Sequence, residues 1–162
     1  LDLSENKLSG HMPSEIGNLT NLTELMLYDN ELTGEIPKEL WELMNLEILG
    51  LSVNNFSGQI SSDITNLNNL KRLWLRDNQL SGEIPIEIGN LTNLITLYLS
   101  NNELTGFIPS EIENLTNLTG LYLNDNQLSG DIPESICNLI ESLSYSNIDD
   151  ILEGNNLNNT CE

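Results

Sequence analysis

The sequence predicts a right-handed solenoid of 24-residue coils with a parallel sheet on its concave side. The stretch from Leu70 to Asn93, LKRLWLRDNQLSGEIPIEIGNLTN, recurs along most of the 162-residue chain at a fixed offset of 24 residues. Within each copy, apolar residues hold the same positions while their neighbours vary. Such a period indicates units that bury a shared core only by stacking on one another.

Each coil is expected to begin with a short strand, because its leucines alternate with variable residues, as at Leu73 and Leu75. Alternation turns the leucines toward the core and their neighbours outward. Stacking the coils would join these strands into a parallel sheet. We expect coils over residues 1–139, with a truncated first coil and five full coils that start near Leu22, Leu46, Leu70, Leu94 and Leu118.

An asparagine marks the point where each coil turns away from its strand. Its amide both donates and accepts hydrogen bonds, so it can pair with the backbone of its own turn and of a neighbouring coil. We therefore predict a structural ladder rather than a ligand site at these positions. The ladder consists of Asn6, Asn30, Asn54, Asn78, Asn102 and Asn126.

The remainder of each coil predicts a short second strand followed by a helical turn. A glycine in the recurring Leu-Ser/Thr-Gly-x-Ile wording allows the bend between the two strands. A proline then occupies the first position of the turn, except in the coil where Ser61 replaces it. Each coil should thus close through a 3-10 or short helical turn on the convex side.

This pattern resembles the plant-specific class of leucine-rich repeat, LxxLxLxxNxLxGxIPxxLxxLxx, and the match covers most of the chain. Similar repeats form plant receptor-kinase ectodomains, polygalacturonase-inhibiting proteins and secreted bacterial and algal proteins. The resemblance implies a leucine-rich-repeat solenoid, an extracellular or cell-surface location and an interaction role, with ligand contacts on the concave face. It names no ligand.

Charge and composition exclude several other functions. The net charge of -20, from 25 acidic against 5 basic residues, argues against nucleic acid and anionic membranes as partners. No run approaches the ~18 apolar residues of a membrane span, so this segment should not insert into a membrane. The acidic side chains repeat along a line, whereas calcium needs converging oxygens, so we predict no metal and no cofactor. His11 is the only histidine and has no matched nucleophile, so no catalytic residue and no enzyme are expected.

The outward positions of the central strand are the strongest candidates for binding. Arg72, Trp74 and Arg76 alternate with buried leucines and project from one face, where Gly50 leaves a notch beside the indole. Arginine, tryptophan and tyrosine dominate the energetics of many interfaces. The alternative is that the aromatics are ordinary repeat wording and that the arginines pair with Asp29, Asp77 or Asp125. The candidate ligand-binding residues are Met26, Tyr28, Arg72, Trp74, Arg76, Asp77, Tyr98 and Tyr122.

Residues 140–162 are expected to form a degenerate last coil that caps the solenoid. Leu152 and Gly154 fit the leucine and glycine positions of a further 24-residue repeat. Cys137 and Cys161 are one period apart, so stacking should bring them within disulfide range. Two cysteines in an extracellular chain favour pairing.

We therefore predict an extracellular recognition module, monomeric in this segment, that binds a protein, peptide or glycan on its concave sheet. The chain opens in the middle of a repeat, so further coils are expected upstream. The alternative function is a structural surface or adhesion element that contacts ice or polysaccharide through a flank rich in threonine and asparagine. Interruptions such as Met44 and Lys71 in the threonine columns disfavour this alternative.

Overall fold

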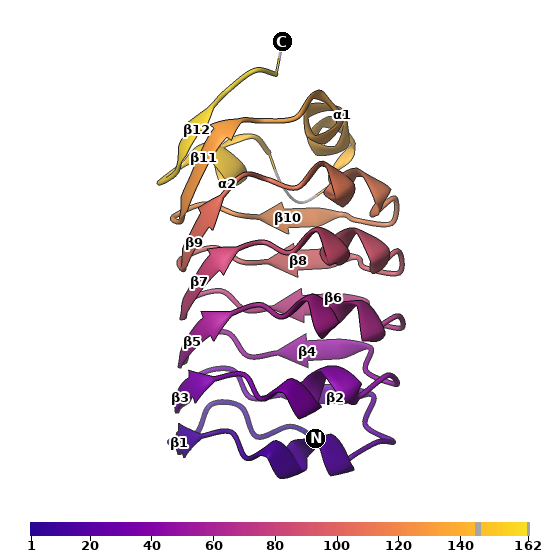
Figure 1. Ribbon diagram of the computed structural model, residues 1–162, viewed down its shortest axis with the longest axis vertical. Helices are drawn as coiled ribbons and strands as arrows, with labels where there is room; N and C mark the ends of the chain where they lie inside the picture. The colour runs from indigo at the N-terminus through magenta and orange to yellow at the C-terminus, as the bar shows by residue number, and fades with distance from the viewer. Residues whose placement is uncertain (145–146, 162) are drawn as a thin grey trace.

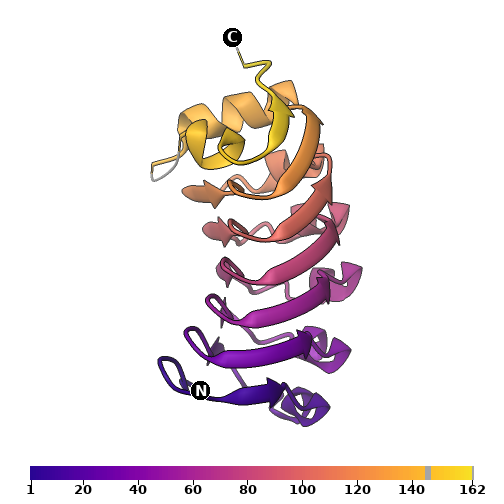
Figure 2. The same cartoon turned by 90° about the vertical axis from the view of Figure 1, so that its left-hand side faces the viewer.

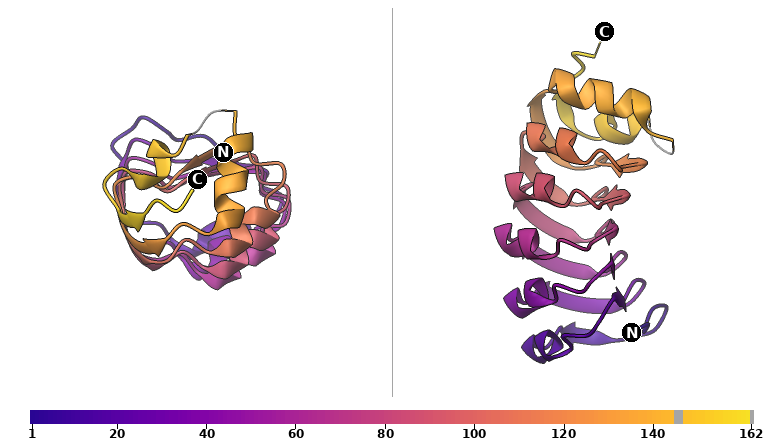
Figure 3. Two further views of the ribbon diagram at one scale, coloured as in Figure 1. Left: turned by 90° about the horizontal axis from the view of Figure 1, so that it is seen from above. Right: turned by 90° about the vertical axis from the view of Figure 1, so that its right-hand side faces the viewer.

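The computed structural model describes residues 1–144 and 147–161, and its coils stack along one long axis with the two termini at opposite ends (Figure 1). Seen from above, the coils lie over one another (Figure 3). The fold is the predicted solenoid, because each of the five full coils contributes one strand to each of two parallel sheets.

The first strands of the coils form a five-stranded parallel sheet, which we call the concave sheet. Leu73 pairs with Leu49 on one side and with Leu97 on the other. All three leucines are fully buried, so the repeat holds each inward leucine in one column of the core. The strands are β2 (Glu24–Met26), β4 (Ile48–Gly50), β6 (Arg72–Trp74), β8 (Thr96–Tyr98) and β10 (Gly120–Tyr122).

The second strands form a seven-stranded parallel sheet, which faces the viewer in Figure 2. Its strands are β1 (Ser9–His11), β3 (Glu31–Glu35), β5 (Asn55–Gln59), β7 (Gln79–Glu83), β9 (Glu103–Gly106), β11 (Gln127–Asp131) and β12 (Asn156–Asn158). A glycine with a left-handed backbone lies in each of these strands except β12, for example Gly82 at φ 76. A side chain would strain that conformation, which explains why glycine recurs there.

Five 3-10 turns connect the second sheet to the next coil: η1 (Ser14–Asn18), η2 (Lys38–Glu42), η3 (Ser62–Asn66), η4 (Ile86–Asn90) and η5 (Ser110–Asn114). The expectation of proline at the first helical position is off by one residue. Each proline is the N-cap, with an extended backbone, as Pro85 shows at φ -66 and ψ 137. In the one coil without proline, the Ser61 hydroxyl accepts the backbone N–H of Asp63 at 3.1 Å. Serine thus satisfies a helix-end donor there.

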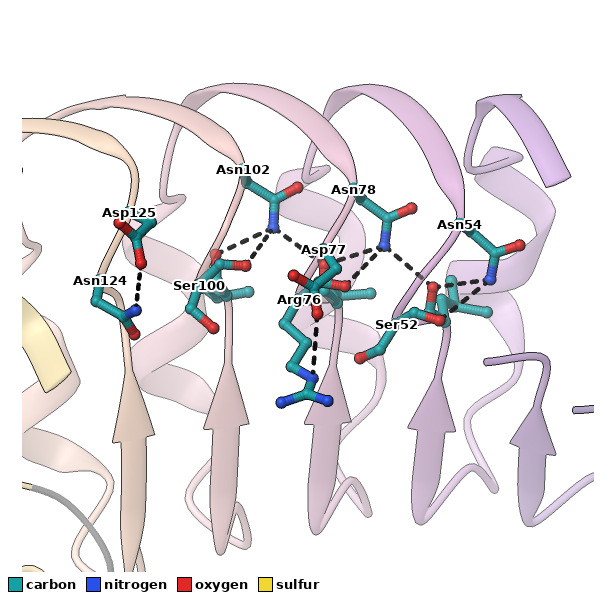
Figure 4. Close-up of polar contacts among 12 residues, drawn as sticks. Ser52, Asn54, Arg76, Asp77, Asn78, Ser100, Asn102, Asn124 and Asp125 are labelled. Carbon is teal, nitrogen blue, oxygen red and sulfur yellow. Dashed lines mark hydrogen bonds and ion pairs between the residues drawn. The ribbon is translucent and has the colours of Figure 1, made fainter. Parts of the chain in front are cut away.

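The predicted asparagine ladder is present and ties neighbouring coils together. The amide nitrogen of Asn102 donates to the backbone oxygens of Leu75, Leu99 and Ser100 at 3.0, 3.0 and 3.2 Å. Its oxygen accepts the N–H of Leu80 at 3.0 Å. Asn30, Asn54, Asn78 and Asn126 repeat this pattern, and Figure 4 shows it for Asn54, Asn78 and Asn102. Asn6 donates only within its own coil.

A second asparagine column, which the sequence analysis did not single out, links the coils at the opposite end of the concave strands. Asn93 donates its amide to the backbone oxygen of Asn68 in the preceding coil at 2.8 Å. Asn45, Asn69 and Asn117 make the equivalent bond at 2.9 Å. Each concave strand is therefore held to its neighbour by an amide at both ends.

The register expected for the last coil is wrong. Leu157, not Leu152, pairs with Gly130, and Asn155 takes the next ladder position. The Asn155 side-chain oxygen accepts the N–H of Leu128, 27 residues earlier, whereas the Asn126 oxygen accepts the N–H of Leu104, 22 residues earlier. The last coil is therefore five residues longer than the others, and Gly154, at φ 68, supplies the left-handed residue before the ladder asparagine.

Two helices account for the extra length and cover the end of the solenoid. The nine-residue α1 (Glu134–Ser142) replaces the 3-10 turn. In place of a concave strand, α2 (Asp149–Leu152) lies at the edge of β10, where Asp150 accepts the N–H of Leu123 at 2.9 Å. Ile151 is fully buried. Residues 145, 146 and 162 of the expected capping coil lie outside the described residues.

The disulfide between Cys137 and Cys161 is present, with Cα atoms 5.3 Å apart. The reason given for it from the sequence, that a spacing of one 24-residue period stacks the two cysteines on each other, is nevertheless wrong. The last coil is longer than 24 residues, so Cys161 does not occupy the repeat position of Cys137. The bond instead joins α1 to the segment just after β12. It fastens the chain end onto the cap.

Candidate functional site

The predicted aromatic residues form one row across the concave sheet. Trp74 on β6 pairs with Tyr98 on β8, which pairs with Tyr122 on β10. The Trp74 and Tyr98 rings stack, with centroids 6.0 Å apart and planes 18° apart. The Tyr98 and Tyr122 rings meet edge to face at 4.8 Å. Both geometries are favourable for aromatic pairs, so the row is a preformed, half-buried surface.

Met26 continues this row past Gly50, and it closes the expected notch. A Cβ atom on Gly50 would lie 3.0 Å from the Met26 sulfur and 3.5 Å from the Trp74 ring. The Met26 side chain therefore leans over the glycine and reaches toward the indole. The prediction of an open notch beside Trp74 is wrong at Gly50.

The open space lies further along the same coil, at Ser52 and Val53. A hollow of about 310 Å³ is lined by Tyr28, Ser52, Val53, Trp74, Arg76 and Tyr98, which we call the Ser52 hollow. Tyr28 and Arg76 come from the coils on either side of Ser52, and Figure 4 shows Arg76 on the coil next to Ser52. Four of the predicted binding residues thus converge on a cavity whose floor the sequence analysis missed.

The polar tips of two aromatic walls are already engaged. The Trp74 indole N–H donates to Thr96 Oγ1 at 2.9 Å, and the Tyr28 hydroxyl donates to Glu5 Oε1 at 3.0 Å. The bond to the Glu5 carboxylate, together with its charge, raises the pKa of Tyr28. Burial and the neighbouring Tyr122 raise the pKa of Tyr98, against the opposing effect of Arg76 and Arg72. These phenols are therefore neutral at physiological pH.

The positive charges of the patch are only partly neutralised. Arg76 Nε lies 3.4 Å from Asp77 Oδ2, with both side chains substantially exposed, and Lys71 pairs with Glu47 at 2.7 Å. Arg72 is exposed and forms no ion pair within residues 1–144 and 147–161. Of the acidic partners considered, Asp77 pairs with an arginine, and Asp125 accepts a bond from Asn124 instead. Exposed ion pairs of this kind contribute little to stability.

Neither a metal-ligand cluster nor a membrane-spanning helix is found in the described part of the chain. Among those residues, no group of three or more histidine, cysteine or acidic side chains could hold a metal ion. None of the helices there is long and apolar enough to cross a membrane. The fold defines a class of repeat protein whose stacked coils present a concave parallel sheet.

The chain belongs to the leucine-rich-repeat family. The profile described as Leucine Rich Repeat matches residues 1–19, 21–43 and 45–67, and the profile for two copies of the repeat matches 68–115 and 92–136. A search of the curated proteins finds no match.

Solved structures with the same fold include plant receptor ectodomains. The plant peptide hormone receptor RGFR1, solved with RGF2, is 39% identical with a TM-score of 0.89, over 97% of this chain and 24% of that one. The GASSHO1/SCHENGEN3 ectodomain from Arabidopsis thaliana was solved with CASPARIAN STRIP INTEGRITY FACTOR 2 and is 39% identical to this chain, with a TM-score of 0.88. That match covers 96% of this chain and 18% of the ectodomain chain. This protein therefore spans a quarter or less of these receptors. This chain is extracellular, because its structural relatives are extracellular domains of plant receptors and because it contains a disulfide.

A third relative has a different activity. A plant ice-binding protein is 30% identical to this chain with a TM-score of 0.80, and the match covers 97% of this chain and 57% of that one. The repeat fold is thus shared by proteins with unlike ligands, so the function must be argued from the surface of this chain.

Proposed function

We propose that this protein is an extracellular recognition module whose concave sheet binds a protein, peptide or glycan ligand, with a peptide or protein as the best-supported class. The observation that carries the proposal is the row of Trp74, Tyr98 and Tyr122 beside the Ser52 hollow, flanked by Arg72 and Arg76. Preformed aromatic surface with adjacent arginine is typical of interface hot spots.

The charge distribution supports the same surface. The chain carries a net charge of -20, yet three of its five basic residues lie on or beside β6. A cationic site within an acidic surface gives a ligand one electrostatically distinct place to bind. Two of the related ectodomains were solved with a peptide or protein factor bound, which supports a ligand of that class here.

The proposal is tested by selecting peptides from a random library on the immobilised 162-residue protein, with a glycan array run in parallel. Selected peptides should bind Trp74→Ala and Arg76→Ala about 30-fold more weakly than the wild type, as expected for hot-spot residues. Glu83→Ala, on an exposed position of β7, is the matched control and should bind as the wild type does. Thermal melts should show that all three variants fold.

Two results would contradict the proposal. One is peptides or glycans that bind the two concave variants as tightly as the wild type. The other is ligands whose affinity falls with Glu83→Ala and with neither concave change.

Ice contact is the second candidate, because an ice-binding protein shares the fold at 30% identity. The threonine flank offers little regular surface, since Met44 interrupts its column and is 64% exposed. Thermal-hysteresis measurement on the protein distinguishes the candidates. We expect no hysteresis above that of an equally acidic control protein, and a clear freezing-point gap would favour ice binding.

A further inference from the structure

Two departures from the repeat meet at one cavity beside the second sheet. Trp41 holds the position that glycine holds in two other coils, as Gly17 and Gly89. Ser61 holds the position of the proline that the other coils have. Both residues line a cavity of about 670 Å³, which we call the Trp41 pocket. The other polar side chains of its lining are those of Glu35, Lys38, Gln59 and Ser81.

The Trp41 pocket lies where three neighbouring coils leave the second sheet for their turns (Figure 1). Glu35 ends β3, Gln59 ends β5 and Ser81 lies in β7. Trp41 and Lys38 belong to η2. The lining residues, all within the described part of the chain, include none from the five concave strands. The pocket is therefore separate from the aromatic row and from the Ser52 hollow.

Trp41 presents an unpaired donor at this pocket. The residue is only 1% exposed, and its indole N–H has no hydrogen-bond partner within the described residues. The side-chain atoms there that are both unpaired and fully enclosed are the hydroxyls of Ser4 and Ser52, and the indole nitrogen is not among them. The small exposed part of Trp41 therefore includes this nitrogen. Buried indole N–H groups normally have a partner, so here the partner must be water or a ligand atom in the pocket.

Ser61 adds a second donor that proline would not supply. Its hydroxyl oxygen accepts the N–H of Asp63 at 3.1 Å, which leaves its own proton free to donate. The backbone at Ser61, with φ -65 and ψ 144, is one that proline adopts readily. The fold therefore does not require serine at this position.

The same lining offers acceptors. The Glu35 side chain lies against the sheet over Gly58, where an added Cβ atom would be 2.7 Å from the Glu35 Cγ. Its carboxylate oxygens accept hydrogen bonds, and the Gln59 amide both donates and accepts them. Lys38 is exposed, forms no ion pair within residues 1–144 and 147–161, and adds a further donor. Donors and acceptors thus alternate around one cavity.

This mixture favours a neutral ligand with many hydroxyl groups. Each hydroxyl of a sugar both donates and accepts, so it can pair with either kind of group in the lining. An anion would meet the Glu35 carboxylate in a chain of net charge -20. An apolar side chain would leave the indole N–H and the carboxylate unpaired, and the buried Trp41 ring offers it almost no surface.

We propose that the Trp41 pocket is a second binding site, which takes a neutral sugar of one or two rings. The sugar hydroxyls accept from the Trp41 indole and the Ser61 hydroxyl and donate to the Glu35 carboxylate. A volume of about 670 Å³ lies well within the range of ligand sites, which span ~300–1,000 Å³. The site is additional to the proposed function, because the concave sheet takes no part in it.

The test is an NMR titration of the 162-residue protein with cellobiose, maltose, lactose and xylobiose. The chain has two tryptophans, so two indole N–H signals are expected, and their assignment follows from Trp74→Ala, which keeps only that of Trp41. At least one disaccharide should shift the Trp41 signal and leave the Trp74 signal in place.

Ser61→Pro gives two opposed readouts. It should weaken binding of that disaccharide about fivefold, as the loss of one net hydrogen bond predicts. The melting temperature should be at least that of the wild type, because the backbone there already suits proline. Ser62→Ala, at the exposed neighbour outside the pocket, is the control and should bind as the wild type does.

Glu35→Ala should weaken the same disaccharide about tenfold, since hydrogen bonds to charged groups are the stronger ones. Glu83→Ala is its matched control, because Glu83 occupies the same repeat position two coils away and lies outside the pocket. It should leave sugar binding unchanged.

The sugar site is wrong if none of the four disaccharides shifts the Trp41 signal, or if either Ser61→Pro or Glu35→Ala binds the sugar as tightly as the wild type. It is equally wrong if Glu83→Ala loses as much affinity as Glu35→Ala. Sodium acetate or N-acetyl-phenylalaninamide that moves the Trp41 signal at a lower concentration than any disaccharide would also overturn it.

The two sites fail separately. A sugar held in the Trp41 pocket would bind Trp74→Ala and Arg76→Ala as it binds the wild type. A glycan-array ligand therefore counts against the concave site only when Glu35→Ala leaves its affinity unchanged. If the sugar site fails while library peptides still lose affinity with Trp74→Ala, the proposed function stands.

Discussion

The indole N–H of Trp74 donates a 2.9 Å hydrogen bond to Thr96 on the adjacent strand β8. This bond fixes the orientation of the largest side chain of the candidate site. It also keeps the polar edge of the indole away from a ligand, so that ring surface is presented instead. Preorganisation of this kind lowers the entropic cost of binding.

Thr96→Val should release the indole without disturbing the fold. The two side chains have nearly the same shape, and only the acceptor is removed. We expect the Trp74 indole N–H signal to move in the NMR spectrum and selected peptides to bind several-fold more weakly, with a melting temperature close to that of the wild type. An unchanged indole signal would show that the bond does not hold the ring in solution.

Asn102→Ala should be strongly destabilising, because the Asn102 amide makes four backbone hydrogen bonds and is 9% exposed. Each buried group left unpaired costs about 1–3 kcal/mol, so we expect a loss of about 3 kcal/mol or more in the free energy of unfolding. Asn117→Ala is the control on the exposed second ladder and should cost about 1 kcal/mol or less, since it loses one exposed bond. If denaturant titrations give equal losses for the two variants, the buried ladder does not stabilise the fold more than the exposed one.

Reduction of the Cys137–Cys161 bond should loosen the C-terminal cap. Closing a loop of 24 residues stabilises by about 3 kcal/mol. In a solenoid this loss should stay near its end, so hydrogen exchange should speed up in α1 and β12 and remain slow in β4 and β6. Thiol labelling of unfolded, unreduced protein checks the bond itself. Two reactive thiols would contradict it.

The raised pKa of Tyr28 predicts a pH-dependent contribution to stability. Since its phenol donates to the Glu5 carboxylate, the folded state favours the protonated form. Its contribution should be fully present below the ordinary tyrosine pKa of about 10 and lost as pH rises through the higher folded value. Glu5→Gln should bring the titration midpoint of the Tyr28 ring signals back toward the ordinary value. An identical midpoint in both proteins would exclude the Glu5 carboxylate as the cause.

The sequence predicts the coils well because local chemistry and period agree at every position. The inward leucines, the asparagine ladder and the second strand each depend on one residue type at one offset, and stacking makes each environment identical. Glycine and asparagine columns are especially informative, since few residues can replace them. The resemblance to plant-type repeats could also be read directly from this wording.

The last coil and the Ser52 hollow were not predictable in the same way. A five-residue insertion shifts the register, and Leu152 and Gly154 fit a 24-residue repeat by coincidence, whereas the structure uses Asn155 and Leu157. The hollow depends on the side-chain orientations of Met26 and Trp74. The period of a repeat does not specify those orientations. One signal was present nonetheless, because Val53 interrupts a column of acidic and amide side chains.

The central claim, that the concave sheet is the binding surface, is tested most directly by a hydrogen-exchange footprint of a library-selected peptide on the wild-type protein. The account predicts slower amide exchange in β4, β6 and β8 and around Ser52, with no change in β5, β7 and β9 of the second sheet. Protection confined to the second sheet or to the 3-10 turns would contradict it.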